Sequence, residues 1–202
     1  RQPLAEVAEI LKAYPNIHFH VDAVQGIGKG MQSEIFNERV DFVTLSGHKF
    51  HAPRGIGFLY KRRGRHIAPL LTGGGQEHDL RSGTENVPAI AAMAKALRLL
   101  LTDERQKVQQ QNAIRQRLFE HISQADKTVM FSQMTNQFAP HILCFAIKGV
   151  LGETIVHAFE EHEIYISTTS ACSSKKGTES STLKAMHVNE KIATSAVRIS
   201  LD

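Results

Sequence analysis

Lys49 is the residue of this sequence whose position most needs a chemical explanation. It follows a strand-like run at 41–45 and stands in the small, apolar stretch "SGHKF". Burying a charged amine costs free energy. Such a lysine therefore either extends its ammonium group to solvent or works as a partly desolvated, neutral amine that forms a Schiff base with a carbonyl group. Taken alone, the position favours the solvent-exposed lysine.

Asp22 favours the second interpretation. It ends a strand-like run at 17–21, expected in the same sheet as 41–45, and ligands of open α/β sheets bind at the carboxyl ends of strands. An aspartate beside a Schiff-base lysine is the pair that pyridoxal 5'-phosphate requires, because the carboxylate keeps the pyridine nitrogen protonated and the ring can then accept electrons. Taken alone, Asp22 could also be a helix N-cap, since "DAVQ" resembles a capping box.

Polar residues beside these two could hold the rest of the same cofactor. Ser46 and His48 flank Lys49 with donors suited to a phosphate group. Gln25, about one turn after Asp22, can donate to the phenolic oxygen of the ring. The sequence therefore predicts a pyridoxal phosphate site formed by these five residues.

Four histidines raise the alternative of a zinc site on the same strands: His18, His20, His48 and His51. Zinc sites usually combine histidine with cysteine or carboxylate ligands at short, regular spacings. No cysteine or carboxylate completes such a spacing here, so we expect no bound metal.

The two cysteines have contrasting surroundings. Cys172 lies in "SACSSKKG", which indicates an exposed loop where nearby positive charge favours the thiolate; it is either an idle surface thiol or a nucleophile. Cys144 stands between Leu143 and Phe145 and is expected to be a buried packing thiol. Two cysteines make no disulfide framework and favour a reducing compartment, the cytoplasm.

The overall composition argues against several classes of protein. The 202 residues are 42% hydrophobic and 22% charged, as in ordinary globular domains, and no apolar run is long enough for a transmembrane helix. The 24 Lys and Arg exceed the 20 Asp and Glu slightly, and "KRRGRH" at 61–66 supplies much of the excess. No aromatic residues interleave with this cluster to stack on bases. We interpret it as a solvated turn and expect neither a nucleic acid nor a membrane partner.

Strands and helices alternate along the chain, which predicts the α/β class. Asn86 and Pro88 suit the cap and first turn of a long helix, and a composition shift inside that helix predicts two domains, 1–115 and 116–202. The chain looks like a piece of a longer protein. Strands are expected near 17–21, 41–45, 55–60, 141–147, 164–167 and 196–201, and helices near 3–13, 88–124 (with a bend), 152–162 and 182–187.

Taken together, these motifs resemble those of the class V aminotransferases of PLP fold type I. The resemblance rests on "HVDAVQGIGK" and "DFVTLSGHKFHAPRGIGFLY". It is narrowed to cysteine desulfurases of the NifS/IscS kind by "GGGQEHDLRSGTENVPAIAAM", "STTSACSSKKGTESSTLKAM" and "SAVRISL". It implies that 1–115 is part of a large, mostly parallel cofactor-binding domain and that 116–202 is a small α+β domain carrying the cysteine loop.

The resemblance assigns roles to the positions that match the family's motifs. Lys49 matches the lysine that forms the Schiff base with pyridoxal phosphate. Asp22 matches the partner of the pyridine nitrogen, and Gln25 the partner of the phenolate oxygen. Ser46 and His48 match ligands of the phosphate.

Three further positions have implied roles. Thr84, in "RSGT", matches a residue that reaches the phosphate of the other subunit's cofactor in a homodimer. Arg198 matches the arginine that receives the substrate carboxylate through a bidentate pair. Cys172 matches the nucleophile that takes sulfur from L-cysteine as a persulfide.

The implied reaction converts L-cysteine to L-alanine and passes sulfur to an acceptor protein of iron–sulfur cluster assembly or tRNA thiolation. A selenocysteine lyase and a small-amino-acid aminotransferase are alternatives within the family, although an aminotransferase has no use for Cys172. An inactive fragment is a further alternative. The family's ring-stacking residue and an asparagine near the ring would lie in a part of the protein that precedes this chain.

Overall fold

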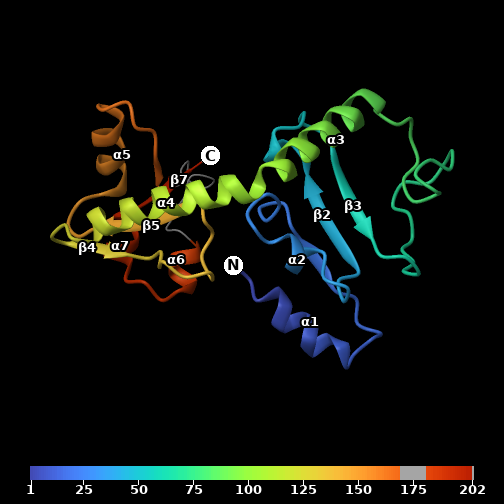
Figure 1. The fold of residues 1–202 in the computed structure, drawn as a ribbon, viewed down its shortest axis with the longest axis horizontal. Coiled ribbons are helices and arrows are strands. Elements are labelled where there is room, and N and C mark those ends of the chain that lie inside the picture. The colour runs from blue at the N-terminus through green and yellow to red at the C-terminus, as the bar shows by residue number, and fades with distance from the viewer. Residues whose placement is uncertain (169–180, 202) are drawn as a thin grey trace. The chain divides into compact units, whose positions relative to one another are not determined.

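The computed structural model describes residues 1–168 and 181–201 (Figure 1). Contacts divide the chain into two compact units. One comprises Gln2–Arg105, and the other begins at Gln106 and includes Arg1. The division falls within helix α4 (Glu104–Ser123). The boundary expected from the sequence, between 115 and 116, lies further along the same helix and stays a prediction.

The first unit contains a three-stranded sheet with helices packed against it. Strands β1 and β2 run parallel, and β3 returns antiparallel to β2, in the order β1-β2-β3. The unit's elements are α1 (Leu4–Lys12), β1 (His20–Asp22), α2 (Gln32–Ile35), β2 (Phe42–Ser46), the 3-10 helix η1 (Gly47–Phe50), β3 (Gly57–Lys61) and α3 (Val87–Thr102).

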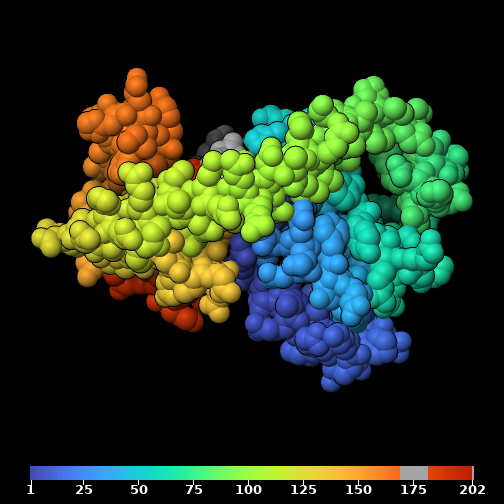
Figure 2. All heavy atoms as spheres, viewed as in Figure 1, coloured from blue at the N-terminus to red at the C-terminus, as the bar shows by residue number. Residues whose placement is uncertain are grey.

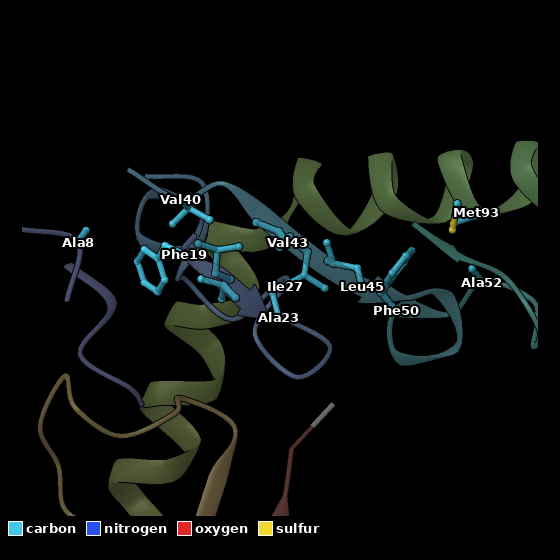
Figure 3. Packing of buried hydrophobic residues seen from close by; sticks show 12 residues of the cluster. Ala8, Phe19, Ala23, Ile27, Val40, Val43, Leu45, Phe50, Ala52 and Met93 are labelled. Carbon is cyan, nitrogen blue, oxygen red and sulfur yellow. The ribbon is translucent and has the colours of Figure 1, made fainter. Parts of the chain in front are cut away.

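The hydrophobic core of this unit lies on one face of the sheet. Val21 and Val43 are paired in register, and Leu45 lies two residues further along β2, so the three side chains share that face. All three are buried. They belong to one cluster with Ala8 of α1 and Met93 of α3 (Figure 3). Asp22, Thr44 and Ser46 lie on the opposite face of the sheet, and their polar groups are outside that core.

Helix α3 begins as the sequence predicts. The Asn86 side chain accepts a hydrogen bond from the backbone N–H of Ala89 at 3.2 Å, and Pro88 lies in the first turn. The expected continuous helix over 88–124 is interrupted at Asp103, where α3 ends and α4 begins. The predicted bend is thus a break between two helices.

The second unit is built on an antiparallel sheet in the order β4-β5-β7-β6. Phe145 and Val197 pack on one face with Ile155 of α5, while Ala146 and Ala196 pack on the other with residues of α6 and α7. After α4 its elements are β4 (Thr128–Met130), β5 (Ile142–Ile147), α5 (Gly152–Glu160), β6 (Ser167–Thr168), α6 (Ser181–Ala185), α7 (Glu190–Ala193) and β7 (Ala196–Ser200).

The α/β class predicted from the sequence is confirmed, and the differences concern short elements. The sequence pattern missed α2, β4 and α7, each of three or four residues, because so few residues display no periodicity. The strand expected at 164–167 is instead β6, which begins at Ser167. Among the described residues, no helix is both long enough and apolar enough to cross a membrane.

Asp41 is a fully buried carboxylate just before β2. Its Oδ2 accepts hydrogen bonds from the backbone N–H of Phe19 and from Arg39 Nη1, each at 2.9 Å. Its Oδ1 accepts from Arg65 Nε at 2.6 Å and lies 3.6 Å from Arg62 Nε. The carboxylate is thus paired with three guanidinium groups and one backbone donor, which offsets the cost of its burial.

The arginines connect this carboxylate to the chain that precedes β1. Arg39 donates through Nε to the carbonyl oxygen of Leu11 at 2.9 Å, and through Nη2 to that of Ile17 at 2.6 Å. Arg65, together with Arg62, comes from the basic cluster at 61–66. The interpretation of that cluster as a solvated turn is therefore wrong for these two residues, because a buried negative charge draws their side chains inward.

Replacing Asp41 with Asn should strongly destabilise the chain. The neighbouring guanidinium groups would lose their counter-charge, and breaking a buried ion pair in this way costs about 3–5 kcal/mol. Urea unfolding followed by circular dichroism measures the loss. The control is Glu9→Gln, which removes the exposed pair between Glu9 and Lys12 and should change the midpoint far less. Equal effects of the two substitutions would contradict the assigned role of Asp41.

The contribution of Asp41 should also depend on pH. Burial by itself raises the pKa of Asp41, but the Phe19 N–H, Arg65 and Arg39 together outweigh it and hold the pKa below its usual value. The folded state therefore favours the ionised form. The stabilisation is fully present above the unfolded-state pKa of about 3.9 and is lost as the pH falls through the lower folded-state pKa. The stability difference between wild type and Asp41→Asn should narrow from pH 5 to pH 3; a constant difference would contradict this.

Candidate active site

Asp22 and Lys49 follow the carboxyl ends of two neighbouring parallel strands. Asp22 is the last residue of β1 and pairs in register with Thr44 of β2. Lys49 lies in η1, which begins immediately after β2 ends at Ser46. Because parallel strands end at the same edge of a sheet, both residues lie at one edge, where α/β sheets bind ligands.

The Asp22 side chain is exposed and makes one local contact. Its Oδ1 accepts a hydrogen bond from the backbone N–H of Val24 at 3.0 Å. This is the short-range bond of an aspartate at a turn; residues 24–28 form turns and no helix. The alternative that Asp22 caps a helix is therefore wrong. Gln25 lies in this turn, also exposed.

The chain around Lys49 is fixed by a tight turn. The backbone N–H of Ala52 donates to the carbonyl oxygen of Gly47 at 3.0 Å, and His51 adopts a left-handed conformation with φ of 65°. A Cβ atom on Gly47 would lie 2.9 Å from the carbonyl oxygen of Ile56, so glycine is required there. Lys49 itself is exposed, which differs from the partial desolvation expected of a reactive amine.

The residues flanking Lys49 provide further polar groups. Ser46 Oγ and His48 Nδ1 are 2.9 Å apart and hydrogen-bonded. One sheet edge therefore carries a carboxylate after β1 and a hydroxyl, an imidazole and an amine after β2. This donor set fits pyridoxal phosphate, which needs an acid for its ring nitrogen, an amine for its aldehyde and neutral or cationic donors for its phosphate.

Thr84 lies in the same compact unit, in the long segment between β3 and α3. It is exposed, and it lines a cavity of about 690 Å³ together with β3 residues and residues 77–86. This segment, teal to green at the right of the space-filling view, stands at the margin of the unit (Figure 2).

Two predicted site residues belong to the second unit. Arg198 lies in β7 between Cys144 of β5 and Ser167 of β6, its partners in register. Its Nε is buried and has no hydrogen-bond partner among the described residues, so the guanidinium retains capacity for an anionic group. Cys172 falls within 169–180 and lies outside the described residues.

Cys144, predicted to be a buried packing thiol, is partly buried. Burial raises the pKa of its thiol to about 11, although the positive charge of Arg198 acts in the opposite direction. The neutral thiol is therefore the resting form at physiological pH, which agrees with the predicted packing role. Within the described ranges, no group of three or more His, Cys, Asp or Glu side chains is arranged to hold a metal ion.

Sequence reasoning missed two polar contacts in the first unit, the first of them near this edge. His20 Nε2 is 3.2 Å from Thr44 Oγ1, which links β1 to β2 next to Asp22. Gln76 Oε1 accepts a hydrogen bond from the backbone N–H of Gly83 at 3.0 Å, next to Thr84. The glycines at 73–75 and 83 were the available signal for the second contact. Closely spaced glycines often mark places where chain segments approach each other closely.

The sequence is similar to those of known proteins over its whole length. The family described as aminotransferase class-V matches residues 1–202. The chain is 58% identical over 201 residues to a NifS/IcsS protein homolog of Lactobacillus delbrueckii subsp. bulgaricus, covering 100% of this chain and 52% of that protein. It is 36% identical over 200 residues to a cysteine desulfurase IscS of Methanosarcina thermophila, covering 99% of this chain and 49% of that protein.

Solved structures agree with the sequence comparison. A NifS-like protein superposes with a TM-score of 0.82 at 33% identity, over 99% of this chain and 51% of that chain. A NifS-like protein from Rickettsia africae gives 0.79 at 29% identity, over 98% of this chain and 52% of that chain. This chain thus belongs to the class V aminotransferase family and has the α/β fold of its NifS-like members. It spans about half the length of the relatives it matches.

Cys144 should react slowly with alkylating reagents in the folded protein. With a pKa of about 11, roughly one thiol in a thousand is ionised at pH 8, against roughly a quarter for an unperturbed thiol. Iodoacetamide labelling of the Cys172→Ser protein, read by mass spectrometry, isolates this thiol. Labelling should be slow in buffer and fast in urea. Labelling in buffer as fast as that of free cysteine would contradict the assigned environment.

Proposed function

We propose that the protein containing this chain is a pyridoxal phosphate-dependent cysteine desulfurase, which converts L-cysteine to L-alanine. The observation that carries the proposal is the position of Asp22 and Lys49 after the ends of two parallel strands. The names of the relatives support the same activity.

Residues of the first unit would hold the cofactor. Asp22 keeps a proton on the pyridine nitrogen, and Gln25 donates to the phenolate oxygen. Ser46 and His48 donate to the phosphate, and Thr84 to the phosphate of the cofactor bound by the partner subunit of a homodimer. When bound, pyridoxal phosphate supplies an electron sink for the negative charge that develops at the substrate's Cα.

Lys49 and Cys172 would carry out the chemical steps. Lys49 would hold the cofactor through its Nζ amine and would remove the Cα proton of the substrate as a general base. The Cys172 thiolate then attacks the substrate sulfur. The new S–S bond would form as the substrate's Cβ–S bond breaks, and the electron pair of that bond would remain on carbon. Cβ would take up one proton and Lys49 would return the proton to Cα, so that the product leaves as alanine.

The remaining assignments concern substrate, acceptor and location. Arg198 binds the substrate carboxylate, for which its buried, unpaired Nε is suited. The persulfide on Cys172 passes its sulfur to an acceptor protein of iron–sulfur cluster assembly or tRNA thiolation. The presence of two cysteines in 202 residues supports a reducing, cytoplasmic location.

The two cysteines provide a matched test of this proposal. In the intact protein loaded with pyridoxal phosphate, Cys172→Ser should abolish sulfide release from L-cysteine in the presence of a reductant. Cys144→Ser should retain most of it, because Cys144 is a partly buried, neutral thiol. Alanine and sulfide are measured together. Equal activity of the two variants would contradict the assignment of Cys172, and transamination without sulfide release would indicate an aminotransferase.

A further inference from the structure

The segment that precedes Thr84 is folded into a strained left-handed turn. Glu77, His78 and Asp79 have φ of 51°, 55° and 62°, a conformation that costs non-glycine residues of order 1 kcal/mol each. The backbone N–H of Asp79 donates to the carbonyl oxygen of Gly75 at 3.1 Å, which closes the turn. Three successive residues keep such a conformation only where surrounding contacts impose it.

Gln76 bonds the part of the segment that follows this turn. Its side-chain Oε1 accepts a hydrogen bond from the backbone N–H of Gly83 at 3.0 Å. Its backbone carbonyl oxygen accepts from the N–H of Arg81 at 3.4 Å. Gln76 therefore bonds the backbone of the following segment at two points, Arg81 and Gly83. The second of these is the residue immediately before Thr84.

Two glycines, Gly74 and Gly83, allow the contacts of the Gln76 side chain. A Cβ atom on Gly74 would lie 2.9 Å from both Oε1 and Nε2 of Gln76. Gly83 has φ of 120°, a conformation that L-residues rarely adopt, and its N–H points to Gln76. Gly74 thus leaves room for the side chain of Gln76, and Gly83 adopts the backbone conformation in which its N–H reaches that side chain.

Thr84 is held in place by its neighbours on both sides. Gly83, immediately before it, is bonded to Gln76. Asn86, two residues after it, caps α3 through the N–H of Ala89. Thr84 is exposed, so no burial of its own side chain defines its position.

We propose that Gln76 is a positioning residue, which holds Thr84 in the orientation needed to bind the phosphate of the cofactor. This inference rests on the proposed function, because the phosphate of pyridoxal phosphate is the ligand of Thr84. A hydroxyl that is already oriented binds a phosphate without paying the cost of ordering the loop. Gln76 itself touches the backbone of the loop, and its effect on the cofactor passes through Thr84.

The test compares pyridoxal phosphate with pyridoxal, which lacks the phosphate. In the intact apoprotein, Gln76→Leu removes the acceptor at similar side-chain size. Affinity for pyridoxal phosphate should fall roughly two- to tenfold, as expected for the loss of one hydrogen bond, while affinity for pyridoxal should remain unchanged. Titration followed by absorbance gives both dissociation constants. Equal loss for the two ligands, or no loss for either, would overturn the proposal.

Further variants establish that Gln76 acts through Thr84. Thr84→Val should produce the same phosphate-selective loss, and the double variant should lose no more than Thr84→Val alone; fully additive losses would overturn the proposal. The control Gln116→Leu removes an exposed glutamine whose side chain donates to Glu120 and should leave both affinities unchanged. Gly74→Ala, whose Cβ displaces the Gln76 side chain, is an independent second variant with the same expected selectivity if Gln76→Leu does not fold.

Amide hydrogen exchange provides a measurement that needs no cofactor. The Gly83 N–H should exchange slowly in the wild type and markedly faster in Gln76→Leu, whereas equal rates would overturn the proposal. An intact wild-type protein that binds pyridoxal phosphate but releases no alanine would refute the proposed function and leave this inference standing, because the inference depends on cofactor affinity alone.

Discussion

The parallel pairing of β1 with β2 is the contact on which the candidate site depends. At the carboxyl end of the pair, Asp22 lies opposite Thr44, and η1 begins immediately beyond β2 with Lys49. At the amino end, the buried Asp41 bonds the backbone of Phe19 and thereby ties the two strands before they begin. A shift of one residue in this register would move Asp22 to the other face of the sheet.

Charged residues have contrasting environments at the two ends of this strand pair. At the amino end, the carboxylate of Asp41 is removed from solvent and surrounded by Arg39, Arg62 and Arg65, so its charge is satisfied by the fold. At the carboxyl end, the side chains of Asp22 and Lys49 are exposed to solvent. Charged groups left available at a sheet edge suit a ligand that itself brings complementary charge. The charged residues at the amino end of the strand pair therefore stabilise the fold, and those at the carboxyl end are accessible to a ligand.

The sequence predicted the α/β class, the long elements and the grouping of Asp22 with Lys49, because strand ends and the polar residues beside them are local features. It did not predict the Asp41 network, since the partners of Asp41 come from the chain before β1, the chain before β2 and the turn after β3. Long-range pairing of charges leaves no periodic signal. The sequence did not predict the role of Gln76, for a related reason. A side chain that bonds the backbone seven residues away cannot be distinguished by composition from an ordinary loop glutamine.

The most direct test of the account is the chemical identity of the residue that binds the cofactor. The intact protein, incubated with pyridoxal phosphate and reduced with borohydride, is digested and its peptides are analysed by mass spectrometry. The account predicts one pyridoxyl group, on the peptide that carries Lys49, and its absence from the Lys49→Ala protein. A pyridoxyl group on another lysine, or none at saturating cofactor, would contradict the central role given to the edge shared by Asp22 and Lys49.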